Sequence, residues 1–94
     1  MTDAKLSEKD FLTAAAKGDV DAVRLGLSQG LTADTSDEHG NTALMMAAAR
    51  GQRDVCQVLI DAGANPGHKN KFGLGPRNWV DWAKNDGQIR NILG

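Results

Sequence analysis

The stretch GNTALMMAAARG at residues 40–51 decides the fold, because part of it has a counterpart earlier in the chain. The segment AAAKGDVDAV (14–23) aligns without a gap on AAARGQRDVC (47–56). Three pairs of glycines keep the offset of that alignment: Gly18 and Gly51, Gly30 and Gly63, and Gly40 and Gly73. Self-similarity at a fixed period of this length predicts an array of stacked repeats.

The composition of residues 40–51 fits such a stack. The stretch carries four alanines and two methionines, with no charge before Arg50. A free amphipathic helix would instead place large apolar side chains on one face and charges on the other. Alanines allow neighbouring helices to approach closely, while leucine and methionine fill the remaining gaps. We therefore expect this segment to be a helix that is packed on more than one side.

Each repeat is predicted to hold two short helices, each ended by a glycine. In the first copy, Ser7 is the expected N-cap of a helix over residues 8–17, which Gly18 ends. Asp19 is then expected to cap a second helix over residues 20–29.

The second copy repeats this pattern. Thr42 is the expected N-cap of a helix that Gly51 ends, and the next helix, over residues 53–62, ends at Gly63. Met45 is expected to lie partly in the core and Met46 to border the concave face, the alternative being that the pair belongs to an adaptable binding groove. The side chains expected to face inward recur at helical spacing, and they are Leu44, Ala47, Ala48, Val55, Val58 and Leu59.

The third copy, residues 70–94, is distorted. We interpret Gly75, Pro76 and Arg77 as an insertion before its first helix, with Asn78 as the N-cap and Gly87 as the stop. Its register stays open at this point. Aligning Gly87 with Gly51 requires about three extra residues, whereas aligning Ile89 and Ile92 with Val55 and Val58 requires one.

Two tryptophans belong to this last copy. Trp79 and Trp82 are three residues apart and fall on one face of a helix. We expect them to pack as a cap on the shortened repeat, the alternative being a ligand clamp.

The repeat resembles the ankyrin-repeat family. The proline and the first-helix histidine that are usual in that family are replaced here by Ala43 and Met45. The segment DWAKNDG (81–87) resembles a common ending of ankyrin arrays. The matching positions are Asp37, Gly40, Thr42, Leu44, Ala47, Ala48, Gly51, Asp54, Val55, Leu59, Gly63 and Ala64.

The resemblance implies an all-α solenoid of stacked helix-turn-helix pairs joined by hairpin-like loops. The whole chain, residues 1–94, is then a single domain. Within it we expect an N-terminal capping repeat over 1–36, an internal repeat over 37–69 and a degenerate C-terminal capping repeat over 70–94.

Composition argues against several classes of function. The formal net charge is −1 and no basic run is present, so neither nucleic acid nor an anionic membrane is an expected partner. We expect no disulfide, because Cys56 is the single cysteine, and no metal or other cofactor, because His39, His68 and Cys56 lack a ligand spacing. The opening residues lack a secretory signal pattern, so a cytoplasmic location is expected.

Catalytic motifs are also lacking. The sequence contains no glycine-rich phosphate loop and no G-x-S-x-G elbow, and its carboxylates fall mainly at helix caps and turns. We therefore expect a protein that is not an enzyme and has no catalytic residues.

The resemblance implies that a partner protein docks on the turn tips and on the exposed side of the first helices. His39 at a tip is either a contact residue or a solvated turn residue, and Phe72 is either a contact or is folded onto Leu74. The predicted partner-binding residues are Glu38, His39, Asn41, Met46, Ala49, Arg50, Lys71 and Phe72.

Two other functions remain open. The protein could be a stoichiometric inhibitor or protector of a specific enzyme or toxin rather than a general adaptor. Alternatively, an apolar face at Ile89, Ile92 and Leu93 could mediate self-association into a weak homodimer.

Overall fold

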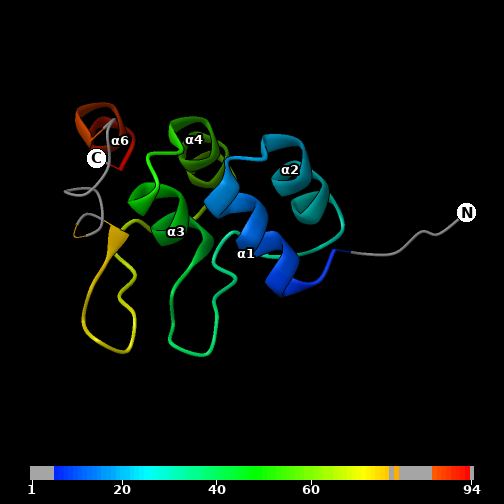
Figure 1. Cartoon of the computed structure of the whole chain (residues 1–94), viewed down its shortest axis with the longest axis horizontal. Helices are drawn as coiled ribbons and strands as arrows, with labels where there is room; N and C mark the ends of the chain where they lie inside the picture. The colour runs from blue at the N-terminus through cyan, green and yellow to red at the C-terminus, as the bar shows by residue number, and fades with distance from the viewer. Residues whose placement is uncertain (1–5, 77, 79–85, 94) are drawn as a thin grey trace, which may run out of the picture.

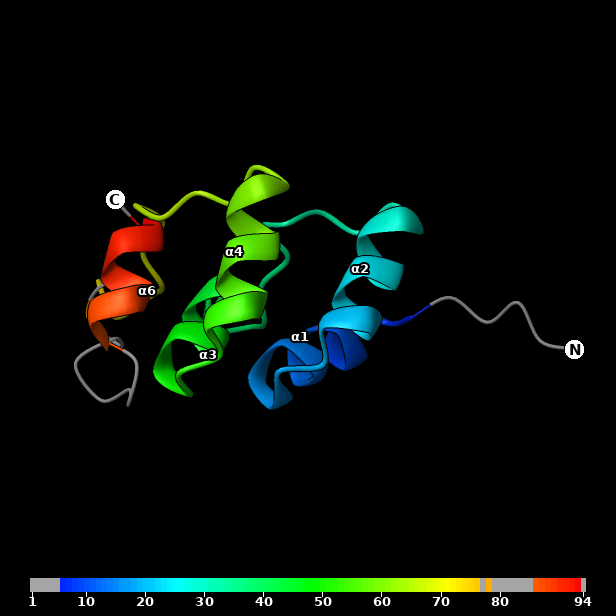
Figure 2. The same cartoon turned by 90° about the horizontal axis from the view of Figure 1, so that it is seen from above.

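The computed structural model describes residues 6–76, 78 and 86–93. The helices lie in two layers, with α1 and α3 side by side in one layer and α2, α4 and α6 in the other (Figures 1 and 2). The loops after α2 and α4 both project from the same edge as long hairpins (Figure 1). The described residues contain no strand, only an isolated bridge between Ser36 and Thr42, which confirms the all-α stack of helix pairs. The helices are α1 (Glu8–Lys17), α2 (Val20–Ser28), α3 (Ala43–Ala49), α4 (Arg53–Asp61) and α6 (Asp86–Leu93).

The predicted caps begin and end these helices. Backbone N–H groups donate to Ser7 Oγ at 3.0 Å, to Asp19 Oδ1 at 3.1 Å and to Thr42 Oγ1 at 3.3 Å. Each bond satisfies an amide that has no partner inside its own helix. Gly18 and Gly51 take left-handed conformations with φ of 82° and 72°, a region that favours glycine.

The core runs between the two layers. Leu44, Ala47, Ala48, Val55 and Leu59 are each no more than 1% exposed, while Val58 is only partly buried. Met45 is also 1% exposed, so it is buried more deeply than the partial core position that was expected. Because α3 packs against both α1 and α4, little of its surface is left to solvent.

The first repeat fills the space between its helices differently from the second. Phe11 and Gly26 occupy the positions that Leu44 and Leu59 take one repeat later. A Cβ atom added at Gly26 would lie 2.5 Å from Phe11 Cδ1, well inside van der Waals contact. The Phe11 ring therefore fills the room that a second leucine fills in the internal repeat.

The start of the third repeat differs from the prediction. Pro76 and Asn78 are already helical, so Asn78 is not the N-cap, and Gly75 and Pro76 do not form an insertion ahead of the helix. The Gly75 N–H donates to Asn78 Oδ1 at 2.8 Å, which is one half of a capping box. Proline is favoured at the first helical position because its missing N–H would have no partner there. Arg77, Trp79 and Trp82 lie outside the described residues.

Burial of α6 settles the register of this repeat. Ile89 and Leu93 are 0% and 3% exposed, and their counterparts Val55 and Leu59 are fully buried as well. Ile89 follows Val55, and Leu93 follows Leu59, by one residue more than Gly51 follows Gly18. The third copy therefore contains a single extra residue relative to the second.

Two expectations about this helix are wrong. Gly87 lies inside α6 and is not a helix stop, because α6 takes its register from apolar contacts with α4. Ile89 and Leu93 are buried within the chain, so neither contributes to the exposed apolar face that was expected there for self-association.

Candidate partner-binding site

Two adjoining hollows lie between α1, α3 and the first hairpin. The larger encloses about 670 Å³ and the smaller about 240 Å³. Ala16, Met46 and Arg50 line both, so we treat them as one feature, called the groove below. Its other lining residues are Glu8, Lys9, Leu12, Thr13, Lys17, Ser36, Asp37, Glu38, Asn41, Met45 and Ala49.

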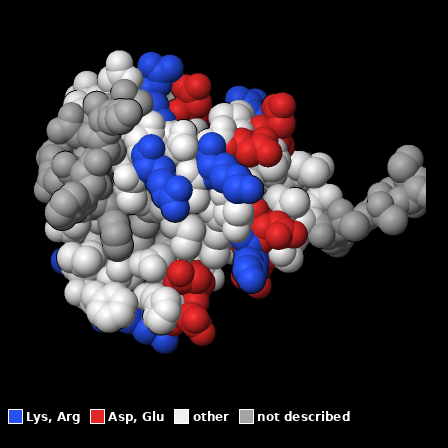
Figure 3. Space-filling view, viewed as in Figure 1, with Lys and Arg blue, Asp and Glu red and all other residues white. Residues whose placement is uncertain are grey.

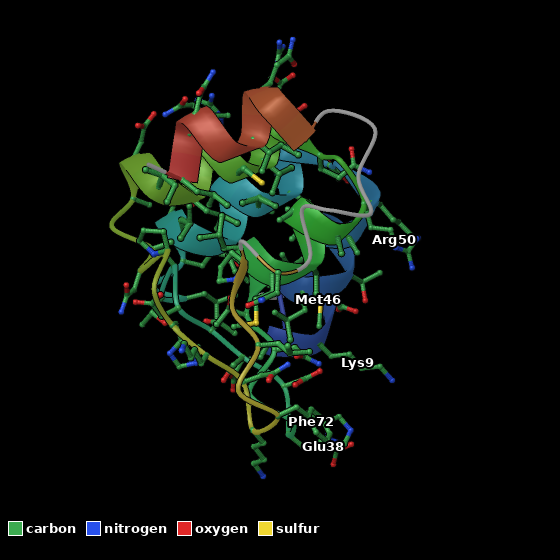
Figure 4. All side chains as sticks on the ribbon, turned by 90° about the vertical axis from the view of Figure 1, so that its left-hand side faces the viewer. Lys9, Glu38, Met46, Arg50 and Phe72 are labelled. Atoms are coloured by element: carbon green, nitrogen blue, oxygen red, sulfur yellow. The ribbon has the colours of Figure 1, made fainter. Side chains whose placement is uncertain are left out.

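The floor of the groove is apolar. Leu12 and Ala16 from α1 meet Met46 from α3, and Met46 is partly exposed. Met46 lies between Arg50 and Lys9, with Phe72 and Glu38 beyond them at the hairpin tips (Figure 4). A methionine side chain is flexible and polarisable, so it can adapt to apolar side chains of different shapes.

Charged side chains of both signs border this floor. Lys9 and Lys17 come from α1 and Arg50 from the C-cap of α3. Glu8 from the first turn of α1 and Asp37 and Glu38 from the first hairpin line the groove as well. Figure 3 shows basic side chains over α1 and α3, with acidic ones beside them over α1 and over the hairpin below. The groove therefore presents an apolar centre bordered by charges of both signs.

Asp37 shapes the first hairpin. Its Oδ1 accepts hydrogen bonds from the N–H groups of His39 and Asn41, both at 2.9 Å, and its Oδ2 accepts from Asn41 Nδ2 at 3.4 Å. Desolvation by burial acts to raise the pKa of this carboxyl, but the hydrogen bonds from Asn41 and His39 outweigh it and lower the pKa below its ordinary value.

The second hairpin repeats this arrangement with an amide in place of the carboxylate. Asn70 Oδ1 accepts from the N–H groups of Phe72 at 2.8 Å and Leu74 at 3.0 Å. Asn70 takes the position of Asp37 one repeat later and is only 7% exposed. The two hairpins are therefore built on the same turn, with Asp or Asn at its first position.

Hydrogen bonds join the hairpins to each other. Asn70 Nδ2 donates to Asn41 Oδ1 at 2.7 Å, and the Lys71 N–H donates to the His39 carbonyl at 2.9 Å. These bonds fix the spacing of the two tips, so the hairpins present one ordered surface.

Exposed rings lie at the tips of the hairpins. Phe72 is 71% exposed, and its ring centroid lies 6.2 Å from that of His39 with the planes tilted by 35°. The Phe72 ring is therefore exposed beside His39 rather than folded onto Leu74. His39 Nε2 also lies 3.6 Å from Glu38 Oε1, which places an acidic group next to the His39 ring.

The structure distributes the predicted binding residues over two neighbouring places. Met46, Ala49, Arg50, Glu38 and Asn41 line the groove, although the Asn41 amide also holds the hairpins together. The remaining three are at the tips, and they are His39, Lys71 and Phe72.

Sequence reasoning missed the α1 side of the groove. Thr13, Ala16 and Lys17 occupy the positions of Met46, Ala49 and Arg50 one repeat earlier. Moving the predicted binding positions of the second repeat back by one repeat length would have identified these three residues. Lys9 has no such signal, because its counterpart is the buried cap Thr42.

Other chemistries find no site in the part of the chain that the structure describes. There, no three His, Cys, Asp or Glu side chains gather as they would around a metal ion. Burial raises the pKa of Cys56 to about 12, so its thiol is neutral and unreactive. No helix among the described residues is both long and apolar enough to cross a membrane.

Comparison with known proteins places the chain among repeat proteins. Residues 2–70 match a family model described as Ankyrin repeats (3 copies). The ankyrin repeat protein YahD of Escherichia coli (strain K12) is 39% identical over 67 residues, which cover 71% of this chain and 33% of that protein. Ankyrin repeat and SAM domain-containing protein 6 of Danio rerio is 42% identical over 71 residues, which cover 74% of this chain and 10% of that protein. The potassium channel AKT2/3 of Arabidopsis thaliana is 44% identical over 57 residues, covering 60% of this chain and 7% of the channel. The chain thus spans a third or less of the length of these relatives.

Proposed function

Because the chain belongs to the ankyrin-repeat family, we propose that it is a non-enzymatic module that binds a partner protein in the groove and on the hairpin tips. Ankyrin repeats generally serve as protein–protein interaction modules. The observation that carries the proposal is the groove itself, an apolar floor bordered by charge and continuous with two exposed tip residues, Phe72 and His39.

The ordering of this surface supports recognition by a rigid body. The bonds between the hairpins, together with the packing of α1 against α3, hold the binding residues in place before a partner arrives. A preordered surface loses little conformational entropy on binding, so more of the interaction energy remains as affinity. We expect Arg50 and Phe72 to contribute most, because arginine and aromatic side chains dominate protein interfaces.

The test is a triple variant, His39→Ala, Arg50→Ala and Phe72→Ala, measured against a partner captured from native extract. We expect its affinity to fall at least tenfold while its helical circular dichroism stays unchanged, because all three side chains are largely exposed. A matched control is Arg24→Ala, Leu25→Ala and Gln57→Ala, three exposed residues on α2 and α4 outside the groove. Equal affinity of the two triple variants would rule out this face.

The same surface would serve a stoichiometric inhibitor or protector. If the captured partner is an enzyme, titrating it with the chain separates this function from that of an adaptor. Loss of activity that is complete at one chain per enzyme indicates an inhibitor, while unchanged activity indicates an adaptor.

A further inference from the structure

The basic residues of the groove have no acidic partner among the described residues. Lys9, Lys17 and Arg50 are exposed, and in the part of the chain that the structure describes none has a carboxylate oxygen within 4.0 Å of its charged nitrogens. Lys17 lies in the last turn of α1, where the helix dipole offsets a part of its charge. Lys9 is near the other end of α1 and gains no such offset.

The acidic residues of the groove are, in contrast, already engaged. Asp37 accepts two backbone N–H groups of its own hairpin, and Glu38 lies 3.6 Å from His39. Glu8 is in the first turn of α1, where the helix dipole favours a negative charge. These carboxylates keep their negative charge, but the three basic side chains of the groove lack a hydrogen-bond or ion-pair partner within the described chain.

The distance between the basic residues determines how far apart acidic side chains on a bound segment must lie to pair with them. Lys9 and Lys17 are eight residues apart on one helix, which puts their Cα atoms about 12 Å apart along its axis. The apolar floor formed by Leu12, Ala16 and Met46 lies between them. In an extended segment, residues at i, i+2 and i+4 share one face, and the outer two are about 13 Å apart. An acidic, an apolar and a second acidic side chain at those positions would match Lys9, the floor and Lys17.

From this match we infer that the groove binds an extended segment of a partner protein with the pattern acidic–x–apolar–x–acidic. The apolar side chain, Leu, Met or Phe, contacts Met46, while the carboxylates pair with Lys9 and Lys17. Arg50, on the α3 side, adds a third positive charge. This inference rests on the proposed function, because it names the chemistry of the partner that the groove receives.

The test begins with a randomised dodecapeptide library displayed on phage and selected on the immobilised full chain. We expect the selected peptides to be enriched in Asp or Glu two residues on either side of Leu, Met or Phe. Selection of peptides without that enrichment, or of no peptide at all, would overturn the inference.

Synthetic versions of the selected peptides, labelled with fluorescein, then give affinities by fluorescence anisotropy. Replacing Lys9, Lys17 and Arg50 together by Gln should weaken binding roughly tenfold, because each exposed ion pair contributes only modestly. The same loss should occur for the wild-type chain at high salt, which screens exposed charges. The control is Arg24→Gln, Arg53→Gln and Lys69→Gln, which removes the same charge at exposed positions that do not line the two hollows of the groove.

A charge-reversed pair makes the result specific. The variant Lys9→Glu and Lys17→Glu should reject the acidic peptides and bind the same peptides with Lys in place of each Asp or Glu. Equal binding of the acidic peptides to wild-type and reversed chains would contradict the inference.

The outcomes also separate this inference from the proposed function. Suppose that the selected peptides are neutral or basic and bind the variant of His39, Arg50 and Phe72 less tightly than the wild-type chain. That result would support the proposed binding face and refute only the acidic pattern of the partner. Peptides that bind every variant equally would refute the binding face as well.

Discussion

Replacing Gly26 by alanine tests how the two helices of the first repeat pack together. The added Cβ would lie 2.5 Å from Phe11 Cδ1, 3.1 Å from Phe11 Cε1 and 3.2 Å from Leu31 Cδ1. Phe11 is 0% exposed, so its ring cannot move aside without disturbing the core. The substitution therefore forces a steric conflict at the centre of the repeat.

Two opposing effects set the magnitude. Alanine is favoured over glycine inside a helix by about 1 kcal/mol. Overpacking of a filled core costs about 1–3 kcal/mol, and a contact of 2.5 Å points to the upper part of that range. We expect Gly26→Ala to lower the free energy of unfolding by about 1–2 kcal/mol. In a Phe11→Val background the Cδ1 and Cε1 atoms are absent, so the same change should raise that free energy by about 0.5–1 kcal/mol.

The assay is denaturant unfolding of the four proteins of this double-mutant cycle. The coupling energy between positions 11 and 26 should be about 2 kcal/mol, which is within the range for residues in contact. A control is Gly87→Ala in α6, where no described atom lies within 4 Å of the added Cβ, so that no destabilisation is expected. If Gly26→Ala stabilises the wild-type chain, or if the coupling is below about 0.5 kcal/mol, the packing argument fails.

Two further predictions concern ionisable groups. The hydrogen bonds to Asp37 lower its pKa, so its contribution to stability is complete above its unfolded pKa of about 4 and is lost as pH falls through the folded value. Asp37→Asn should keep the two backbone bonds of the hairpin, as Asn70 does, and should make stability depend less on pH below about pH 4. An unchanged acid profile in urea titrations would contradict this. Burial raises the pKa of Cys56 to about 12, so only the unfolded thiol ionises as pH rises above about 8.5, and stability should fall from there upward. Ellman's reagent at pH 8 should accordingly modify the native thiol only as fast as the protein unfolds, and rapid labelling of the native chain would refute its burial.

Local rules carried most of the fold. Ser7, Asp19 and Thr42 cap their helices as predicted, because an N-cap depends on a side chain and an amide only three residues apart. Two helices end one residue earlier than predicted, since Gln29 and Ala62 are C-cap residues rather than the last helical residues. Such differences change no contact in the core.

The errors arose where a local signal competed with packing or with another local signal. Gly87 resembles a helix stop, but the burial of Ile89 and Leu93 against α4 extends α6 through it. Asn78 resembles an N-cap, but Pro76 begins the helix and the Asn78 side chain bonds backward to Gly75. In the first case only the contacts with α4 choose the register, whereas in the second a proline at the first helical position and a hydrogen bond between residues three apart outweigh the capping signal of Asn78.

The groove could be predicted only in part. The repeat period relates Met46, Ala49 and Arg50 to the equivalent residues of α1, so the α1 side of the groove could have been predicted from the sequence. The bond between Asn41 and Asn70 could not, because the two residues are far apart in the sequence and only stacking brings the hairpins together.

That bond has a consequence for the strength of binding. Asn70 uses its side-chain carbonyl oxygen to close its own hairpin and its amino group to hold the neighbouring one, so together with the Lys71 backbone bond it limits movement of one hairpin against the other. Without the bond between Asn70 and Asn41, a partner protein that binds the hairpin tips would first have to restrict their motion, which costs conformational entropy. Binding at the hairpin tips therefore depends on Asn70, which is 7% exposed and need not contact the partner protein itself.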